Sequence, residues 1–391
     1  MNKEILNTKV QDFINTNLKS DITKLVLKGS SFEHISIQEI AEQISAKLKC
    51  EKKLPIWYSS ENIYFPNRLN IEQTSSEITA KYKANLISGE SLIDITGGFG
   101  VDAYFFSQQV KNVIHCEINE ELSTIVSHNL TSLKTENICT HIGNGIDYLN
   151  KTKSIFDWIY TDPSRRNDAK GKVFLLEDCL PNIPENLDFL FEKTDNILTK
   201  VSPILDISSA INELKFVKEI HIVAVNNEVK ELLFLLEKNY NNDVQIRTIN
   251  FDKKENQIFN FNLYEDQSAT FHEPKKYLFE PNSAILKAGG FNNISQQLHI
   301  DKLHQHSHLY TSNELLNFPG RIFEIKHCIS YDRKQLKKLI PSKKANITTR
   351  NFPESVAQIR KKTKLKDGGN QYLFFTTDVN NKHIVLICEK A

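Results

Sequence analysis

The first 88 residues carry apolar side chains at helical spacing, which predicts a helical N-terminal region. The stretch FEHISIQEIAEQISAKLKCEKKLP indicates a helix that stops at Pro55, because proline cannot continue the hydrogen bonding of a helix. A second helix is expected in SSEITAKYKANL, where Ser75 or Ser76 can act as the N-cap. Between the two, WYSSENIYFPNRLN is expected to form a loop that carries aromatic side chains.

From residue 91 onward, short apolar runs alternate with helical segments. The strand-like runs are SLIDIT, NVIHCEI, NICTHI, FDWIYTD, NILTKVSP, EIHIVAVNN, VQIRTINF and QIFNFNLY. The helical segments include GVDAYFFSQQV, EELSTIVSHNLTSL and EVKELLFLLEKN. This alternation predicts an α/β fold with a parallel, doubly wound sheet of about seven strands that ends near residue 266.

The alternation is lost after a polar linker, EDQSATFHEPKK. The next part holds a strand-like YLFE, a helix-like NSAILKAGGF and a histidine-rich stretch, and it is followed by strand-like runs around lysine-rich segments. We therefore expect a helical region over 1–88, an α/β domain over 89–270, a small domain over 275–320 and an α+β domain over 321–391.

Composition limits the environment and the cofactors. The chain has 391 residues, of which 40% are hydrophobic and 25% charged, as is typical of a globular protein with a sizeable core. Its six cysteines never approach CxxC spacing, which argues against a zinc ribbon or a disulfide framework and fits a reducing cytosol. The start, MNKEILNTKVQDF, lacks a signal-peptide core, and no run of about 18 apolar residues occurs, so we expect a cytoplasmic protein without a membrane span. The histidines of LHIDKLHQHSHLY match no zinc signature, and no metal is expected.

The net charge of +1 conceals a local asymmetry. Residues 326–366 contain 13 Lys and Arg against two acidic residues, a local charge of +11, whereas the rest of the chain has 36 basic and 46 acidic residues. Such a block favours an anionic partner such as nucleic acid, although a solvated lysine-rich face would have the same composition.

A glycine loop follows the first strand of the α/β region. The sequence IDITGGFGVD places Gly97 and two further glycines between a strand and a helix, where glycine lets the backbone turn and approach a ligand closely. Glu117 ends the next strand, from where a carboxylate can accept hydrogen bonds from a ribose. The dinucleotide pattern G-x-G-x-x-G and the lysine of a P-loop are both missing here. The pattern that fits is D-x-[GT]-x-G-x-G, carried by Asp94, Thr96, Gly98 and Gly100.

This pattern resembles motif I of the class I S-adenosylmethionine-dependent methyltransferases, and the resemblance implies a Rossmann-like sheet with S-adenosylmethionine (SAM) as cofactor. In that superfamily the loop cradles the amino-acid part of the cofactor, the acid after strand two binds the ribose, and a polar residue after strand three reads the adenine. Asn144 stands where many members have Asp. The cofactor-binding residues that the resemblance implies are Asp94, Thr96, Gly98, Gly100, Glu117 and Asn144.

The segment IYTDPSRRN ends the fourth strand, at the edge where open α/β sheets place their chemistry. It resembles motif IV of the amino methyltransferases, D-P-P-Y or N-P-P-Y, but Ser164 and Arg165 replace the second proline and the aromatic residue. Pro163 biases Asp162 toward an extended conformation and so aims its side chain. We expect Asp162 and Arg165 to be catalytic, with Asp162 accepting a hydrogen bond or a proton from the target. Pro163, Ser164 and Arg166 are expected to contact substrate, although the two arginines could instead form salt bridges at a helix entry.

The same segment also resembles the DPPR of RNA uracil-5 methyltransferases, which need a cysteine nucleophile after strand five. The corresponding stretch, LTKVSPILD, has no cysteine, so methyl transfer to a nitrogen or a hydroxyl is favoured over transfer to a pyrimidine carbon. Lys200 and Asp206 lie in this stretch. Either could touch substrate, or the two could form a charge pair at the strand end.

Over most of residues 54–391, the chain is similar to the bacterial class I methyltransferases that carry a ferredoxin-like domain and a C-terminal THUMP-like domain. The blocks that carry this resemblance are LPIWYSSENIYFPNRLNIEQTSSEITAKYKANLI, DITGGFGVDAYFF, TDPSRRN, KVSPILDI, VNNEVKELL, YLFEPNSAILKAGGF and SHLYTSNELL. THUMP domains bind RNA, so the resemblance implies an RNA partner. The residues expected to neutralise RNA phosphates are Lys337, Lys338, Lys343, Lys344, Arg360, Lys361 and Lys362. Tyr331 and Phe352 are the aromatic residues of the basic block, which favours structured RNA gripped by its backbone over single-strand stacking.

The leading interpretation is a SAM-dependent methyltransferase that modifies a base nitrogen of tRNA or rRNA. One alternative is a methyltransferase for a small molecule or a protein, whose C-terminal domains act as a lid or an interface. Another is a non-catalytic binder that keeps the cofactor pocket. The sequence indicates no oligomeric state.

Overall fold

The computed structural model describes residues 1–165, 175–265 and 268–391, and the side chains of Arg165 and Lys337 lie outside this description. The chain forms two compact units, Met1–Lys218 with Leu233–Asn242, and Glu219–Leu232 with Asp243–Ala391.

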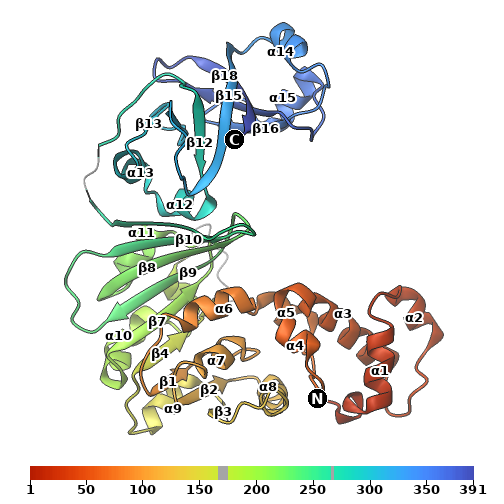
Figure 1. The fold of residues 1–391 in the computed structure, drawn as a ribbon. Coiled ribbons are helices and arrows are strands. Elements are labelled where there is room, and N and C mark those ends of the chain that lie inside the picture. The colour runs from red at the N-terminus through yellow and green to blue at the C-terminus, as the bar shows by residue number, and fades with distance from the viewer. Residues whose placement is uncertain (166–174, 266–267) are drawn as a thin grey trace. The chain divides into compact units, whose positions relative to one another are not determined.

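The N-terminal region is helical, as its apolar spacing predicts (Figure 1, red and orange). The helix α3 begins with a capping box, in which Ser36 Oγ accepts a hydrogen bond from the N–H of Glu39 at 3.2 Å. It ends before Pro55, and α6 begins after Ser76, which is its N-cap. Two short helices, α4 and α5, overlap the ends of the stretch expected to be a loop: Pro55 at the first position of α4 needs no N–H partner there, and Asn67 caps the start of α5. The elements are η1 (Lys3–Leu6), α1 (Thr8–Thr16), α2 (Ile22–Lys28), α3 (Ile37–Lys53), α4 (Pro55–Ser59), α5 (Arg68–Gln73) and α6 (Glu77–Ala84).

The central region is an α/β sheet, which confirms the predicted fold class. Nine strands of the described chain pair in the order β11-β10-β8-β9-β7-β4-β1-β2-β3. Its elements are β1 (Ser91–Asp94), α7 (Val101–Phe106), β2 (Asn112–Glu117), α8 (Glu120–Ser132), β3 (Ile138–Ile142), α9 (Gly145–Lys151), β4 (Trp158–Thr161), β5 (Ser164–Arg165), η2 (Leu176–Asp178), β6 (Cys179–Leu180), α10 (Ile183–Lys193), β7 (Asn196–Val201), α11 (Ile207–Glu213), β8 (Val217–Val225), β9 (Glu228–Glu237), β10 (Gln245–Phe251) and β11 (Gln257–Asn262). The strands β1, β2, β3, β4 and β7 are paired in parallel, and β5 pairs with β6 in a separate two-stranded sheet.

The prediction of a helix in EVKELLFLLEKN is wrong, because this segment forms strand β9. Asn226 and Asn227 adopt left-handed backbone angles, with φ of 51° and 63°, and make the two-residue turn that joins β8 to β9. Such a connection makes the two strands antiparallel. The middle of β9 is buried at successive positions, and an unbroken apolar run gives no period that separates a strand from a helix. The extra strand is one reason why the sheet exceeds the expected seven strands.

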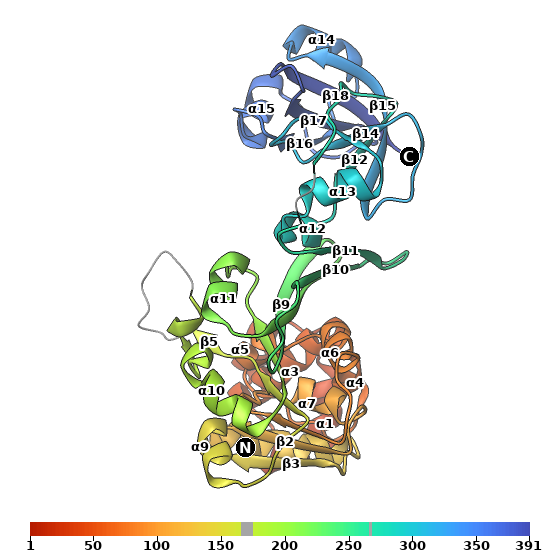
Figure 2. The ribbon, with the colours of Figure 1, turned by 90° about the vertical axis from the view of Figure 1, so that its left-hand side faces the viewer.

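The C-terminal part holds a second sheet, with strand order β13-β14-β12-β15-β18-β17-β16. Leu303 and Leu309 pack in one core cluster with Phe374 and Leu386, although β14 and β17 are separated by three strands in the sheet. The sheet therefore curls, so that its β13–β14 end covers part of its own face. The helix α15 lies beside β16, and α14 packs against α15 (Figure 2). The elements are β12 (Tyr277–Pro281), α12 (Ser283–Ala288), α13 (Phe291–Gln297), β13 (Asp301–Lys302), β14 (Tyr310–Ser312), β15 (Gly320–Ser330), α14 (Arg333–Leu339), β16 (Asn346–Arg350), α15 (Val356–Thr363), β17 (Tyr372–Thr377) and β18 (His383–Lys390).

Candidate active site

The strand order places the site. The chain runs from β1 through β2 to β3 on one side of the sheet, and then crosses to β4 and β7 on the other side. The neighbours β1 and β4 are parallel, so their carboxyl ends lie together at the point where the winding reverses. In open α/β sheets, ligands bind in the crevice at this switch point.

A chain of hydrogen bonds joins the carboxyl ends of β1 and β4. Asp94, which is 1% exposed, accepts hydrogen bonds at Oδ1 from the N–H of Thr96 at 2.9 Å and from its hydroxyl at 3.3 Å. The same hydroxyl oxygen accepts the N–H of Asp162 at 2.7 Å. The residue expected to hold the cofactor loop and the residue expected to face the target are therefore connected through one side chain.

The pKa of Asp94 lies well above its usual value. Burial disfavours the charged form, the N–H of Thr96 partly opposes this effect, and the negative charges of Asp102 and Asp162 raise the pKa further. The two latter carboxylates are thus close enough to Asp94 to repel its charge.

The glycine loop is tied to strand β2. The N–H of Gly98 donates to Glu117 Oε2 at 2.8 Å, and the N–H of Asn119 donates to Oε1 at 2.7 Å. Each carboxylate oxygen has a second lone pair that a ribose hydroxyl could use. Gly100 has a φ of +74°, and a Cβ there would lie 2.7 Å from a methyl of Val126. Only glycine fits this position without displacing α8.

A buried histidine lies beneath the loop. A Cβ on Gly97 would lie 2.3 Å from Nε2 of His115. The imidazole is fully buried, and neither ring nitrogen has a hydrogen-bond partner among the described residues. Burial lowers the pKa of His115 to about 4, so the ring is neutral under ordinary conditions. The ring of His115 therefore occupies the space that a side chain at position 97 would need.

The residue expected to read the adenine, Asn144, also has a structural role. Asn144 is the N-cap of α9, and its Oδ1 accepts the N–H of Ile146 at 2.8 Å. This assignment leaves its Nδ2 group, a donor, to face a ligand. Sequence reasoning missed two apolar neighbours at the ends of β2 and β3, Ile118 and Ile142, whose exposed fractions of 73% and 51% are large for isoleucine.

Sequence reasoning also missed a buried ionic cluster behind the loop. Lys83 of α6 is fully buried, and its Nζ lies 3.0 Å from Oδ1 of Asp102 on α7. Ser75 donates to Oδ2 of Asp102 at 2.8 Å and accepts from Lys83 at 2.7 Å. Tyr160 of β4 also donates to Oδ2 at 2.8 Å. Burial acts to raise the pKa of Asp102, but the charges of Lys83 and Lys200 and these hydrogen bonds outweigh it and lower the pKa. The carboxylate is thus ionised in a site that is nearly closed to solvent.

Asp162 pairs with Lys200 across the ends of β4 and β7. The Lys200 ammonium binds Oδ2 of Asp162, whose side chain remains 34% exposed. Asp206 does not take part in this pair and instead caps α11, where its Oδ1 accepts the N–H of Ser209 at 2.9 Å. Pro163 is buried and Ser164 is exposed. The side chain of Arg165 and all of Arg166 lie outside the described residues.

The basic residues of the C-terminal block differ in what they contact. Arg360 binds Asp367 and donates to the carbonyl oxygens of Leu365 and Ala345, both at 3.3 Å. Lys362 pairs with Glu354 at 2.8 Å. The predicted RNA-binding residues with exposed side chains are Lys338, Lys343, Lys344, Lys361 and Lys362, and the side chain of Lys337 lies outside the described residues.

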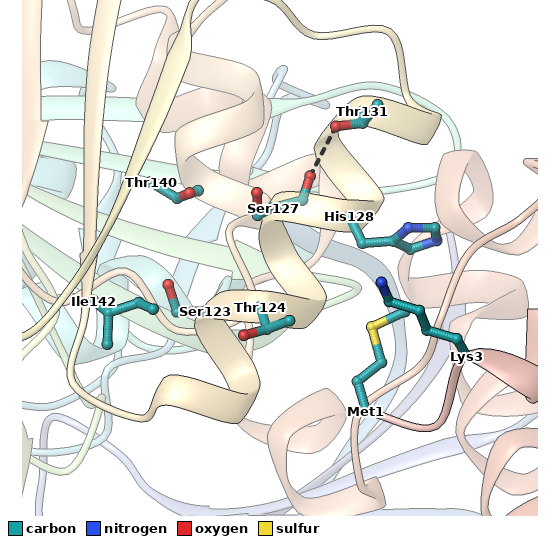
Figure 3. Close-up of a pocket in the computed structure, with 9 residues that line it drawn as sticks. All are labelled: Met1, Lys3, Ser123, Thr124, Ser127, His128, Thr131, Thr140 and Ile142. Atoms are coloured by element: carbon teal, nitrogen blue, oxygen red, sulfur yellow. Dashed lines mark hydrogen bonds between the residues drawn. The ribbon is translucent and has the colours of Figure 1, made fainter.

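A surface pocket of about 370 Å³ lies beside α8 and the edge strand β3 (Figure 3). The α-amino group of Met1 binds Glu121 at 2.8 Å close to this pocket. Its lining is rich in hydroxyl groups and contains none of the predicted cofactor residues. The lining residues are Met1, Lys3, Ser123, Thr124, Ser127, His128, Thr131, Thr140 and Ile142.

No group of three or more His, Cys, Asp or Glu residues that could hold a metal ion occurs in the described part of the chain. No helix in that part is both long and apolar enough to cross a bilayer.

Two domain families match the C-terminal part of the chain, and one solved structure matches the chain over its full length. A ferredoxin-like domain family matches residues 277–319, and a THUMP domain-like family matches residues 320–390. A protein of Porphyromonas gingivalis W83 that is designated a methyltransferase is 32% identical with a TM-score of 0.88, and the match covers 100% of this chain and 98% of that one. No curated protein sequence matches the chain.

Other solved structures match a smaller part of the chain. An rRNA methylase of Streptococcus thermophilus is 17% identical with a TM-score of 0.31, over 41% of this chain and 94% of that one. An O-methyltransferase of Bacillus cereus in complex with SAH is 12% identical with a TM-score of 0.34, over 44% and 88%.

Replacement of Lys83 by methionine should destabilise the protein strongly. The change leaves the carboxylate of Asp102 buried without its cation, which costs about 3–5 kcal/mol of unfolding free energy. Lys81→Met on the same helix is the control, because Lys81 is 57% exposed and lies 3.8 Å from Glu77, and it should change the free energy by less than about 1 kcal/mol. Denaturant unfolding measures both, and equal effects of the two variants would contradict the role given to Lys83.

Replacement of Asp94 by asparagine should make stability less dependent on pH. A folded-state pKa above the unfolded value means that ionisation of Asp94 opposes folding as the pH rises through the folded-state pKa. Asparagine keeps an oxygen for Thr96 but has no charge to bury. The variant should therefore be more stable than the wild type at pH 8, and the difference should shrink toward pH 4. A constant difference across this range, measured by denaturant unfolding, would rule out an energetic penalty from the Asp94 charge.

The glycine at position 97 and the ring of His115 should be energetically coupled. Gly97→Ala alone should cost about 1–3 kcal/mol, because the new methyl group collides with a buried ring. His115→Ala removes the ring, so the double variant should be more stable than the sum of the single effects by at least about 1 kcal/mol. Unfolding free energies of the four proteins test this, and simple additivity would sink the idea.

Proposed function

The chain belongs to the bacterial class I SAM-dependent methyltransferases that carry a ferredoxin-like and a THUMP-like domain, and on this basis we propose that it methylates a base nitrogen of structured RNA, either tRNA or rRNA. The observation that carries the proposal is the position of Asp162. Its N–H donates a hydrogen bond to Thr96 of the glycine loop, and its side chain is partly exposed to solvent.

The enzyme uses SAM, which supplies an electrophilic methyl group when bound. The residues around the loop fit this cofactor. We assign the ribose to Glu117, whose oxygens keep free lone pairs, and the amino-acid part to the loop around Gly98. Ile118 and Ile142 offer apolar surface to the adenine, and the Nδ2 of Asn144 can donate to a ring nitrogen.

Asp162 is assigned to the target nitrogen. Lys200 engages one oxygen of its carboxylate and compensates its charge, which leaves the other oxygen to accept a hydrogen bond from the nucleotide. Pro163 fixes the backbone beside it, and the bond to Thr96 fixes the N–H. The residue is thus held rigidly. Methyl transfer to a nitrogen requires mainly an in-line approach of the reacting atoms, which a rigidly held hydrogen-bond acceptor can position. The nitrogen's proton leaves to Asp162 or to water.

Arg165 and Arg166 complete the proposed transfer site on the sequence argument alone. Guanidinium groups bind phosphates bidentately, so two arginines after Pro163 can hold the backbone of the nucleotide whose base enters the site. Ser164, exposed beside them, is assigned to the same substrate.

The RNA assignment rests on the THUMP-like segment and its exposed lysines. Lys338, Lys343, Lys344 and Lys361 can neutralise phosphates without breaking an ion pair to any described residue, which gives salt-sensitive and weakly sequence-dependent affinity. Tyr331 and Phe352 pack on one another at 5.7 Å and on Phe375, so they are part of the core and not a stacking platform. This arrangement favours a backbone grip on folded RNA.

Nucleoside mass spectrometry tests the proposal. Separated tRNA and rRNA would be digested from the host strain, from a strain that lacks the protein and from one that carries Asp162→Ala. We expect one methylated nucleoside, with its methyl group on nitrogen, to disappear in both altered strains. Asp188→Ala is the matched control, because Asp188 is an exposed surface residue paired with Lys215, and this strain should keep the mark.

The outcomes separate the alternatives. Loss of a methyl group from a pyrimidine carbon would overturn the argument from the missing cysteine. If all RNA methyl marks persist in the strain without the protein, the substrate is a small molecule or a protein.

A further inference from the structure

A buried carboxylate in the C-terminal unit holds two arginines at once. Glu280 of β12 is 2% exposed and lies directly opposite Arg321 of β15. Its Oε2 accepts hydrogen bonds from Nε of Arg321 at 2.7 Å and from Nη2 of the same side chain. Its Oε1 accepts from Nη2 of Arg350 at 2.9 Å and from Nε at 3.3 Å. One negative charge is therefore shared by two positive charges, and the cluster carries a net charge of +1.

The two arginines are oriented but not enclosed. The side chains of Arg321 and Arg350 remain 41% and 33% exposed. Their bonds to Glu280 use Nε and Nη2, and the Nη1 groups have no hydrogen-bond partner within the part of the chain that the structure describes. A guanidinium has five N–H donors, so each residue keeps donors for a ligand. Because Glu280 already fixes their orientation, these two side chains lose less conformational entropy on binding a ligand than flexible surface side chains do.

The surroundings of Arg350 are also positively charged. Lys302 of β13 is nearly buried, and its Nζ is held by two neutral acceptors, Asn292 Oδ1 and the carbonyl oxygen of Gln305, both at 3.2 Å. Burial, Lys302 and Arg350 together lower the pKa of His308 to about 4. The potential at this place therefore favours an anion.

We propose that Arg321 and Arg350 form a phosphate-binding site that grips the RNA backbone. The site lies where the ferredoxin-like segment, which contributes Glu280, meets the THUMP-like segment, which contributes both arginines. The choice of RNA as the source of the phosphate rests on the proposed function.

The geometry suits one phosphodiester. Both guanidiniums are tied to the two oxygens of a single carboxylate, so they lie within reach of one phosphate group, which planar forks bind bidentately. A fixed contact of this kind sets the position of the RNA on the protein and carries no sequence information. It differs from the exposed lysines of the basic block, which are flexible point charges.

The test is the salt dependence of RNA binding by the full-length protein. Affinity for unmodified total tRNA would be measured at several salt concentrations for the wild type, for Arg321→Gln and for Arg350→Gln. Each variant should bind more weakly, and, because both arginines contact one phosphate, the magnitude of the slope of log affinity against log salt should fall by about one in the double variant. SAM affinity should be unchanged in all of them.

Arg247→Gln is the matched control. Arg247 is 37% exposed and pairs with Glu219, with Nε 2.7 Å from Oε2 and Nη2 3.0 Å from Oε1, and this carboxylate also bonds to Nε2 of His221 at 3.0 Å but to no second arginine among the described residues. Its loss should leave the slope as in the wild type. If Arg→Gln variants fail to fold, Arg321→Lys and Arg350→Lys keep the charge beside Glu280 and remove the fork. These should bind tRNA several-fold more weakly while thermal unfolding stays near the wild type.

The outcomes distinguish this proposal from the proposed function. If the wild type binds tRNA and the arginine variants keep its affinity and slope, Arg321 and Arg350 have only a structural role and the proposal fails alone. If the wild type binds no RNA, the proposal fails together with the RNA substrate. If inorganic phosphate competes with tRNA in the wild type but not in the double variant, the phosphate contact is supported directly.

Discussion

The hydroxyl of Thr96 is the group on which the arrangement of the site depends. It donates to the buried Asp94 and accepts the N–H of Asp162, so one atom fixes the distance between the ends of β1 and β4. A hydroxyl is the side-chain group that can donate and accept at the same place in so little space. An apolar substitute of the same shape would leave the N–H of Asp162 without this partner, at a cost of about 1–3 kcal/mol for a buried group, and would leave Asp94 with the N–H of Thr96 alone. The side chain of Thr96 therefore holds the glycine loop and the residue assigned to the target at a fixed separation.

The sequence was informative where a short motif coincides with a strand end. The glycines after the first strand, the acid after the second and the Asp-Pro after the fourth all lie within a few residues of the strand that positions them. The fold class followed from the alternation of strand-like runs and helical segments. The helix expected in place of β9 failed because burial on both faces removes the periodicity that separates the two elements. Lys83 and Asp102 were missed because no motif links residues that are distant in the chain and meet only through packing. The sequence left open whether Lys200 and Asp206 form a charge pair or touch substrate; strand pairing brings Lys200 to Asp162, and Asp206 caps α11.

The basic block shows how much composition leaves open. Thirteen Lys and Arg residues give the same local charge wherever their side chains point. In the structure, Arg360 satisfies backbone carbonyls and an acid, Arg350 binds the buried Glu280, and several exposed lysines form no ion pair with the residues that the structure describes. Charge counts therefore predict that an anion is attracted, whereas only the contacts decide which residues are free to bind it.

The burial of Lys83 has a consequence for how this protein can be divided. The sequence suggests a boundary at residue 88, between a helical region and the α/β domain, yet the ammonium that balances Asp102 and the hydroxyl of Ser75 both come from before that boundary. A fragment that begins at residue 89 would keep the whole glycine loop and lose the cation behind it. The helical region is thus not an exchangeable attachment, because its last helix supplies the cation that balances the buried carboxylate behind the loop.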